Sequence, residues 1–220
     1  GRRPASQAGG TPDARAAARP LVGFMAIDLD EQDGQTPLDP DEKAGLIPEH
    51  LDTKGDLNDW EQENILRAVR WLKRARLPDV LSEGFCRELH KQMFGKTWAW
   101  AGTFRKSDKN IGCDWTQVAV RLKNLFDNTR WWVDNATFSP DEIAARFHRD
   151  LVWIHPFPNG NGRHSRMMSD ALMRSLGQPA FSWGSGGNLV AANDVRARYL
   201  AALRAADQGD YQLLLAFVRS

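Results

Sequence analysis

The spacing of apolar residues predicts a chain built mainly from helices. After Asn58, large apolar side chains recur three and four positions apart, as on the buried face of an α-helix. Asn58 and Glu61 have the spacing of a capping box at the first helix start, and Gly95 is suited to end the second helix. The two apolar stripes are Ile65, Ala68, Val69 and Leu72, then Leu81, Phe85, Leu89 and Met93.

The second half of the chain continues this pattern. A helix is expected after Asp114, with an apolar stripe that runs to Trp132. Ser139 and Pro140 mark another start, because serine is a favoured N-cap and proline suits the first helical position. This helix should stop before Pro156. Further helices are expected at about 161–175, 193–206 and 209–219.

Residues 97–112 depart from the helical pattern. Tryptophan, threonine and phenylalanine roughly alternate there, and a polar turn ends at Gly112, which favours a short β-hairpin or flap. Together with about seven helices, this segment predicts an all-α domain that carries a short β-hairpin flap.

Composition divides the chain into three parts. Residues 1–27 are rich in glycine, alanine, proline and arginine and are expected to be disordered, with Met25 as a candidate natural start. Residues 28–56 are acidic and rich in turn-forming residues, which predicts an extended lead-in packed on the domain. Residues 57–220 are expected to form the domain itself.

Charge, cysteine content and hydropathy exclude several classes of protein. The 29 basic and 28 acidic residues give a net charge of +1, which argues against a basic surface for nucleic acid. Two cysteines, Cys86 and Cys113, are too few for a disulfide framework and suit a reducing cytoplasm. No apolar run reaches the roughly 18 residues of a membrane-spanning helix, and the run at 21–27 is too short for a signal peptide. We therefore expect a cytoplasmic protein that binds neither nucleic acid nor membranes.

One segment between two expected helices, HPFPNGNGRHSR, gathers residues suited to phosphate chemistry. Gly160 and Gly162 allow the backbone to approach a ligand closely, and the following helix N-terminus attracts anions. Arg163 and Arg166 are three positions apart and share a helix face. Two guanidinium groups beside such a turn suit a polyphosphate.

His155 is expected to face the same cavity from the end of the preceding helix. The near-neutral pKa of histidine suits a general base that acts on a hydroxyl group. The alternative interpretation is a loop with a capping asparagine and solvated arginines. The convergence of these residues on one chemistry favours the functional interpretation.

This segment resembles the signature of the Fic (filamentation induced by cAMP) family, H-P-F-x-[D/E]-G-N-G-R-x-x-R. The likeness covers about residues 35–220, and the acidic lead-in resembles the subgroup called mobile mystery protein B. The matching positions are His155, Pro156, Phe157, Gly160, Asn161, Gly162, Arg163 and Arg166.

The resemblance implies a protein adenylyltransferase, which moves AMP from ATP to a serine, threonine or tyrosine hydroxyl of a target protein. It assigns His155 as the base that deprotonates this hydroxyl. It assigns the nucleotide phosphates to a second set of residues: Gly160, Asn161 and Gly162 for the α- and β-phosphates, Arg163 for the β-phosphate and Arg166 for the γ-phosphate.

The resemblance also implies partners other than ATP. The flap, residues 105–112, would pair with an extended segment of the target protein by strand addition. An antitoxin partner and a homo-oligomer are left open. The flap consists of Arg105, Lys106, Ser107, Asp108, Lys109, Asn110, Ile111 and Gly112.

Two positions depart from what the family usually carries. Asn159 stands where members have the Asp or Glu that holds Mg²⁺, and a neutral amide oxygen is a weaker ligand for this cation. Glu63 and Asn64 fit the end of an inhibitory helix motif whose Glu pairs with Arg166, although Asp59 replaces the usual Ser or Thr. The alternative interpretation of Glu63 is a solvated helix residue.

Two other functions are kept as alternatives. The same cavity could transfer UMP, GMP or a phosphate group. A domain of this fold could also bind nucleotide and a partner protein without turnover, an alternative that Asn159 supports and the presence of His155 opposes.

Overall fold

The computed structural model describes residues 38–51, 53–74, 79–184 and 194–220, and within these ranges all regular structure is helical. The expected all-α fold is therefore confirmed. The helices are α1 (Pro40–Lys43), α2 (Lys54–Arg74), α3 (Glu83–Phe94), α4 (Val118–Asp134, preceded by a 3₁₀ turn at Trp115–Gln117), α5 (Pro140–Ile154), α6 (Asn161–Ser175), α7 (Asp194–Asp207) and α8 (Gln212–Val218).

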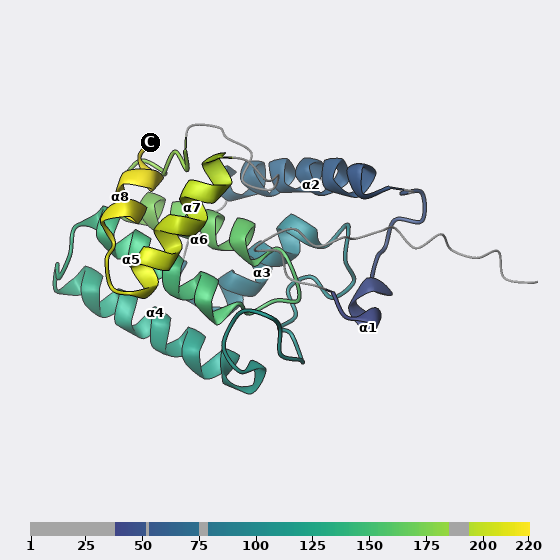
Figure 1. Ribbon diagram of the computed structural model, residues 1–220, viewed down its shortest axis with the longest axis horizontal. Helices are drawn as coiled ribbons and strands as arrows, with labels where there is room; N and C mark the ends of the chain where they lie inside the picture. Colours follow the sequence, from purple (N-terminus) through teal and green to yellow (C-terminus); the bar gives the residue numbers. More distant parts are fainter. Residues whose placement is uncertain (1–37, 52, 75–78, 185–193) are drawn as a thin grey trace, which may run out of the picture.

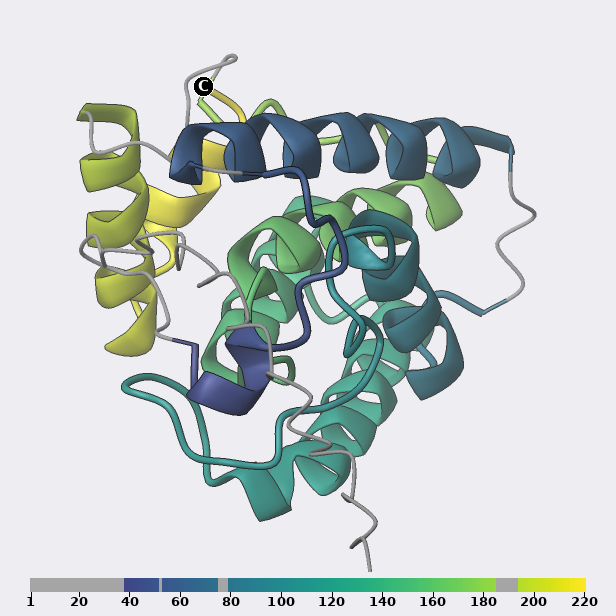
Figure 2. The ribbon, with the colours of Figure 1, turned by 90° about the vertical axis from the view of Figure 1, so that its right-hand side faces the viewer.

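Helices α5 and α6 lie in the middle of the bundle (Figure 1). Helix α4 packs on α5 and α3 packs on α6, while α7 and α8 pack on each other and against α5. Helix α2 packs on α3 and lies at the opposite edge of the molecule from α4, as Figure 2 also shows. The turn between α5 and α6 is thus surrounded by elements from several parts of the chain.

The predicted apolar stripes face the core. Fully buried side chains of α3, α5 and α6 fill the space between these helices. Because interiors are packed as densely as organic crystals, each of these helices is held in register by its neighbours. The largest of the buried apolar side chains include Leu89, Met93, Phe147, Leu151 and Leu172.

Local signals placed one helix start correctly and another wrongly. Ser139 caps α5 by accepting a hydrogen bond from Glu142 N at 3.2 Å, as predicted. Helix α2 instead begins at Lys54, and the expected capping box at Asn58 is wrong. Thr53 and Asp56 form the reciprocal pair at its start: Thr53 N donates to Asp56 Oδ2 at 3.0 Å and Asp56 N donates to Thr53 Oγ1 at 3.1 Å. The observed N-cap, Thr53, thus lies five residues before the expected one.

The expected β-hairpin over residues 97–112 does not form, because this segment consists of turns and bends with one isolated antiparallel bridge between Leu46 and Trp98. Its backbone groups are used elsewhere. Ala99 N donates to Gly45 O at 2.8 Å, and Arg105 N donates to Pro156 O at 2.9 Å. These bonds tie residues 97–112 to the lead-in and to the turn after α5.

The predicted disordered segment, residues 1–27, lies outside the described residues, as does the lead-in up to residue 37. None of the described helices is both long enough and apolar enough to cross a lipid bilayer.

Adjacent leucines of α8 provide a test of the core. Leu214 is fully buried, whereas Leu213 is 54% exposed. We expect Leu214→Ala to lower the free energy of unfolding by about 2–5 kcal/mol, because it removes buried methyl groups and leaves a cavity. Leu213→Ala should change it by no more than about 0.5 kcal/mol. Urea denaturation of the two variants measures both values, and equal losses would contradict the packing of α8.

Candidate active site

The turn between α5 and α6 is set by two left-handed residues. His155 ends α5 with φ 54°, and its N–H donates to Leu151 O at 3.2 Å. Gly160 precedes α6 with φ 78°, and a Cβ atom there would lie 2.6 Å from ring carbons of Phe94. Glycine is thus required at position 160 by both conformation and space. The turn brings the imidazole and the N-terminus of α6 into one short segment.

The Asn161 side chain holds this turn from within. Its Oδ1 accepts from Phe157 N at 2.9 Å, and its Nδ2 donates to Phe157 O at 2.8 Å. Asn161 is buried, so both ends of its amide are engaged by the backbone. The structure therefore gives this side chain a loop-shaping role. Its contact with phosphate stays a prediction.

His155 is buried, with 4% of its surface exposed. Burial, and then the positive charges of Arg105 and Lys109, lower the pKa of His155 to about 4. The imidazole is thus neutral at pH 7 and can accept a proton. Gly112 of the flap packs against it, since a Cβ at position 112 would lie 2.7 Å from the His155 Cβ.

The two arginines of α6 meet different partners. Arg163 Nη1 lies 2.5 Å from Glu61 Oε2 of α2, and its guanidinium stacks over the Phe94 ring at 4.8 Å. Arg166 interacts with the Tyr199 side chain of α7, and burial lowers its pKa. One arginine is therefore matched by a carboxylate and the other by a phenol.

Comparison with known proteins identifies this arrangement. Residues 80–173 match the model of the Fic/DOC family. This part of the chain is similar to that family. The Fic domain so defined contains α3 to α5, the turn and nearly all of α6.

Curated relatives of the chain are named protein adenylyltransferases. It is 32% identical to "Protein adenylyltransferase fic-1" of Caenorhabditis briggsae over 136 residues, which cover 60% of this chain and 25% of that protein. It is 28% identical to "Protein adenylyltransferase Fic" of Drosophila melanogaster over 135 residues, 60% of this chain and 26% of the relative. The chain thus spans about a quarter of the length of these relatives.

Solved structures show the same fold. A fragment of Fic-1 from C. elegans superposes with a TM-score of 0.57 at 26% identity, over 74% of this chain and 48% of that one. The N-terminal FIC domain of Bep8 from Bartonella sp. 1-1C gives a TM-score of 0.61 at 16% identity, over 78% of this chain and 88% of that one. The second likeness concerns the fold alone.

The expected pairing of Glu63 with Arg166 is wrong. Glu63 is exposed and forms an ion pair with Arg67 one turn along α2. Asn64 is buried and donates to Thr97 Oγ1 at 3.2 Å. Two positions on a helix differ by about 200°, so Glu63 points away from the Fic turn while Glu61 points toward it.

Glu61 is the carboxylate that the sequence argument missed. It is 5% exposed, and besides Arg163 it accepts a hydrogen bond from Trp98 Nε1 at 2.7 Å. A signal for it is present in the sequence, because it falls on the buried stripe of α2 at spacings of three and four. This stripe is Leu57, Glu61, Asn64, Ala68 and Leu72.

His90 is a second residue that was missed. Its Nδ1 accepts from Gly102 N at 3.0 Å, so its Nε2 carries the proton and donates to Asn159 O at 3.1 Å. Its ring stacks on Phe157 at 3.8 Å. His90 therefore links the segment before the flap to the turn of the Fic motif.

Asn159 does not form a protein-built magnesium site. Its side-chain Oδ1 accepts from Gly160 N at 2.6 Å. Across the described ranges, no group of three or more His, Cys, Asp or Glu side chains is placed to hold a metal ion. The described residues around Asn159 therefore do not fit a magnesium ion that is held by several carboxylate, histidine or cysteine side chains.

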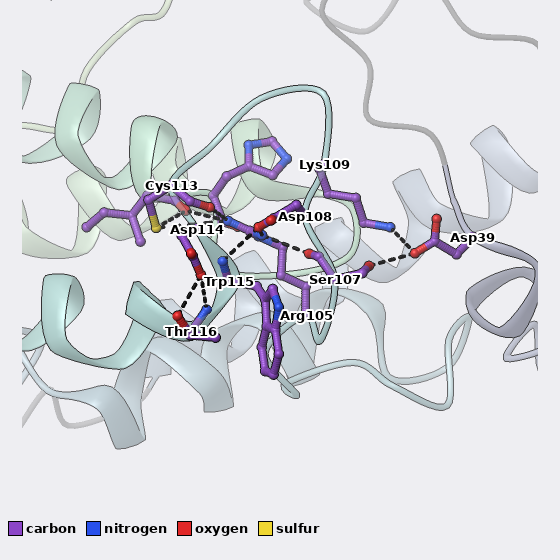
Figure 3. Close-up of polar contacts among 11 residues, drawn as sticks. Asp39, Arg105, Ser107, Asp108, Lys109, Cys113, Asp114, Trp115 and Thr116 are labelled. Atoms are coloured by element: carbon purple, nitrogen blue, oxygen red, sulfur yellow. Dashed lines mark hydrogen bonds and ion pairs between the residues drawn. The ribbon is translucent and has the colours of Figure 1, made fainter.

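The flap is bound to the rest of the chain (Figure 3). Lys109 Nζ lies 2.9 Å from Asp39 Oδ2 and 2.6 Å from Glu42 Oε2, and Ser107 Oγ donates to Asp39 Oδ2 at 2.6 Å. Arg105 is 2% exposed, so its side chain faces the interior of the protein. The docking of a target protein on the flap stays a prediction. The exposed flap residues are Lys106, Asp108, Asn110, Ile111 and Gly112.

Buried histidines predict how stability depends on pH. Burial lowers the pKa of His148 to about 3 and of His155 and His164 to about 4, and it also lowers the pKa of His90 well below its ordinary value. In the unfolded chain these groups titrate near their ordinary pKa of about 6.5, so the unfolded state binds more protons below that pH.

Folding stability should therefore fall as the pH decreases from about 6.5 toward 4, by about 1 kcal/mol per pH unit for each such histidine. Asp170, whose pKa burial raises to about 6, opposes this trend with one group. Urea denaturation at pH 7.5, 6 and 5 measures the slope. A constant or rising free energy of unfolding on acidification would contradict the burial of these rings.

Proposed function

We propose that this Fic domain transfers AMP from ATP to a hydroxyl group of a protein side chain. The observation that carries the proposal is the neutral, buried imidazole of His155, six residues from a helix N-terminus that bears Arg163 and Arg166. The names of the curated relatives support the same reaction class.

In this reaction the attacking hydroxyl gives its proton to His155 as its oxygen bonds to the α-phosphorus. The bond between the α-phosphorus and the oxygen that bridges to the β-phosphate breaks, and pyrophosphate leaves. Arg163 and Arg166 offset the negative charge that develops on this leaving group. The N–H groups of the first turn of α6 have no partner within the helix and suit the phosphate oxygens. Any divalent metal would be held chiefly by the phosphates of the nucleotide.

The target protein would dock along the exposed edge of the flap. An extended segment can add to this edge through backbone hydrogen bonds, which places its hydroxyl near His155. Support comes from Gly112 of the flap, which lies so close to His155 that a Cβ atom at position 112 would be 2.7 Å from the His155 Cβ.

Transfer of label tests the reaction. Wild-type protein is incubated with a bacterial lysate and ATP labelled on either the α- or the γ-phosphate. We expect protein labelling from α-labelled ATP, and His155→Ala should reduce it at least about 100-fold, because general base catalysis contributes this much. His50→Ala, which changes an exposed histidine before α2, is the matched control and should leave the labelling unchanged.

The same assay separates the alternatives. Labelling from the γ-phosphate would indicate phosphoryl transfer, and labelling from α-labelled UTP or GTP in place of ATP would indicate another nucleotide. Binding of ATP without any labelling would contradict the enzymatic proposal and support a binding module.

We further propose that Glu61 restrains this activity. Its carboxylate holds the guanidinium of Arg163 at 2.5 Å, where a phosphate group would otherwise bind. A carboxylate in this place also repels phosphate oxygens. Nucleotide binding therefore has to separate this ion pair, which costs free energy because both partners are largely buried.

Glu61→Gln tests this restraint, since an amide keeps the shape and can still accept from Trp98 Nε1. We expect about tenfold tighter binding of a non-hydrolysable ATP analogue, equivalent to about 1.4 kcal/mol, and a higher rate of labelling. Titration calorimetry measures the affinity. Glu63→Gln, on the opposite face of the same helix, is the matched control and should behave as wild type. Equal gains in both variants, or none in Glu61→Gln, would contradict the role of Glu61.

A further inference from the structure

Arg105 is buried at the base of the flap, and its guanidinium group donates hydrogen bonds to backbone carbonyls. Its Nε donates to His155 O at 2.6 Å, and its Nη1 donates to Ser107 O at 2.8 Å. Its Nη2 donates to Cys113 O and lies 3.4 Å from Ile154 O. A buried cation is costly unless its N–H groups find acceptors, and here backbone carbonyls supply them (Figure 3).

Two of these carbonyls belong to the end of α5. The last carbonyls of a helix have no partner within it, and Pro156 cannot supply an N–H group to them. Arg105 meets the carbonyls of Ile154 and His155, and its positive charge lies at the negative end of the helix dipole. The guanidinium therefore acts as a cap for α5 that comes from a different part of the chain.

The other two carbonyls belong to the flap and the residue after it. By binding Ser107 O and Cys113 O, the same guanidinium closes the flap around itself. Arg105 N adds a backbone bond to Pro156 O at 2.9 Å. Gly112 allows the flap to lie this close to His155, because a Cβ atom at position 112 would be only 2.7 Å from the His155 Cβ.

We propose that Arg105 is a positioning residue that fixes the main chain of His155 and joins it rigidly to the flap. This inference rests on the proposed function, because it concerns the placement of the base relative to the docked hydroxyl. Arg105 sets this geometry through the carbonyl of His155 and the closed shape of the flap. The phosphate-binding residues on α6 have no part in this link.

Arginine suits this position better than lysine. Its planar fork presents five N–H donors in fixed directions, whereas an ammonium group is a single point of charge. Lysine at position 105 would keep the charge but could not bind α5 and both ends of the flap together. The electrostatic surroundings agree, since the charged groups that lower the pKa of His155 are Arg105 and Lys109, both from the flap.

The experiment compares Arg105→Lys and Arg105→Gln with Arg219→Lys in the full chain. Arg219 is the matched control, because it also binds backbone carbonyls, those of Pro179 and Ala180, and pairs with Asp141 at the other end of α5. Three quantities are measured: the histidine ring signals by ¹⁵N NMR across a pH titration, the affinity for a non-hydrolysable ATP analogue, and the kcat of labelling.

We expect both Arg105 variants to shift the His155 ring signal and to raise its pKa, with the larger rise in Arg105→Gln, which also loses the charge. The signals of His148 and His164 should stay in place. The kcat should fall at least tenfold, while the affinity for the ATP analogue stays within twofold. Arg219→Lys should change none of these.

Two results would overturn the proposal: an unchanged His155 signal in both Arg105 variants, or a fall in thermal stability with kcat retained. Failure of the proposed function is distinguishable, because a wild-type protein without transfer activity still allows the NMR comparison. If Arg105→Gln does not fold, Arg105→Lys still tests the proposal, because lysine keeps the charge and most of the volume.

Discussion

The architecture depends on how backbone groups are satisfied between two packed helices. Helix α5 ends before Pro156 and α6 starts at Asn161, so a largely buried turn carries carbonyl and N–H groups that neither helix pairs. Arg105 from the flap, His90 from α3 and the side chain of Asn161 meet these groups. Since an unpaired buried polar group costs about 1–3 kcal/mol, the turn keeps one shape only while these partners stay in place.

The side chains that pair with the backbone of the turn also contribute to the electrostatic potential at the site. After burial, the positive charges of Arg105 and Lys109 lower the pKa of His155, and Arg163 and Arg166 add two cationic groups on α6. Such surroundings keep an imidazole neutral and favour a polyanion at the N-terminus of α6. The groups that shape the backbone and the groups that suit phosphate are therefore parts of one arrangement.

Several structural features that depend on residues close together in the sequence were predicted, and several that depend on distant residues were not. The start of α5 and the apolar face of α3 depend on neighbouring residues, and both were predicted correctly. The motif at residues 155–166 was found for the same reason. The hairpin was wrong, because alternation of large residues in 97–112 reflects packing and bonds to distant segments. The burial of Arg105 was not predicted, since most of its hydrogen-bond acceptors are backbone carbonyls, which any residue type can offer.

The choice between Glu61 and Glu63 shows a different kind of error. Matching a motif by position along the chain selected Glu63, whereas the 3.6-residue period of α2 places Glu61 on the buried face. Both glutamates precede the segment that the Fic/DOC model matches, which begins at residue 80. The family match therefore does not show which glutamate faces the site. The buried stripe of α2 does, because it contains Glu61.

Acidic side chains from this preceding segment reach both sides of the site. Glu61 occupies Arg163 at the phosphate end, while Asp39 and Glu42 occupy Lys109 in the flap. A nucleotide with its phosphates at Arg163 has to displace a carboxylate of the same chain, and a target that uses Lys109 has to do the same at the flap. If the domain has the proposed function, residues before it set the free energy that substrates must supply before His155 can act, whichever nucleotide or target the domain takes.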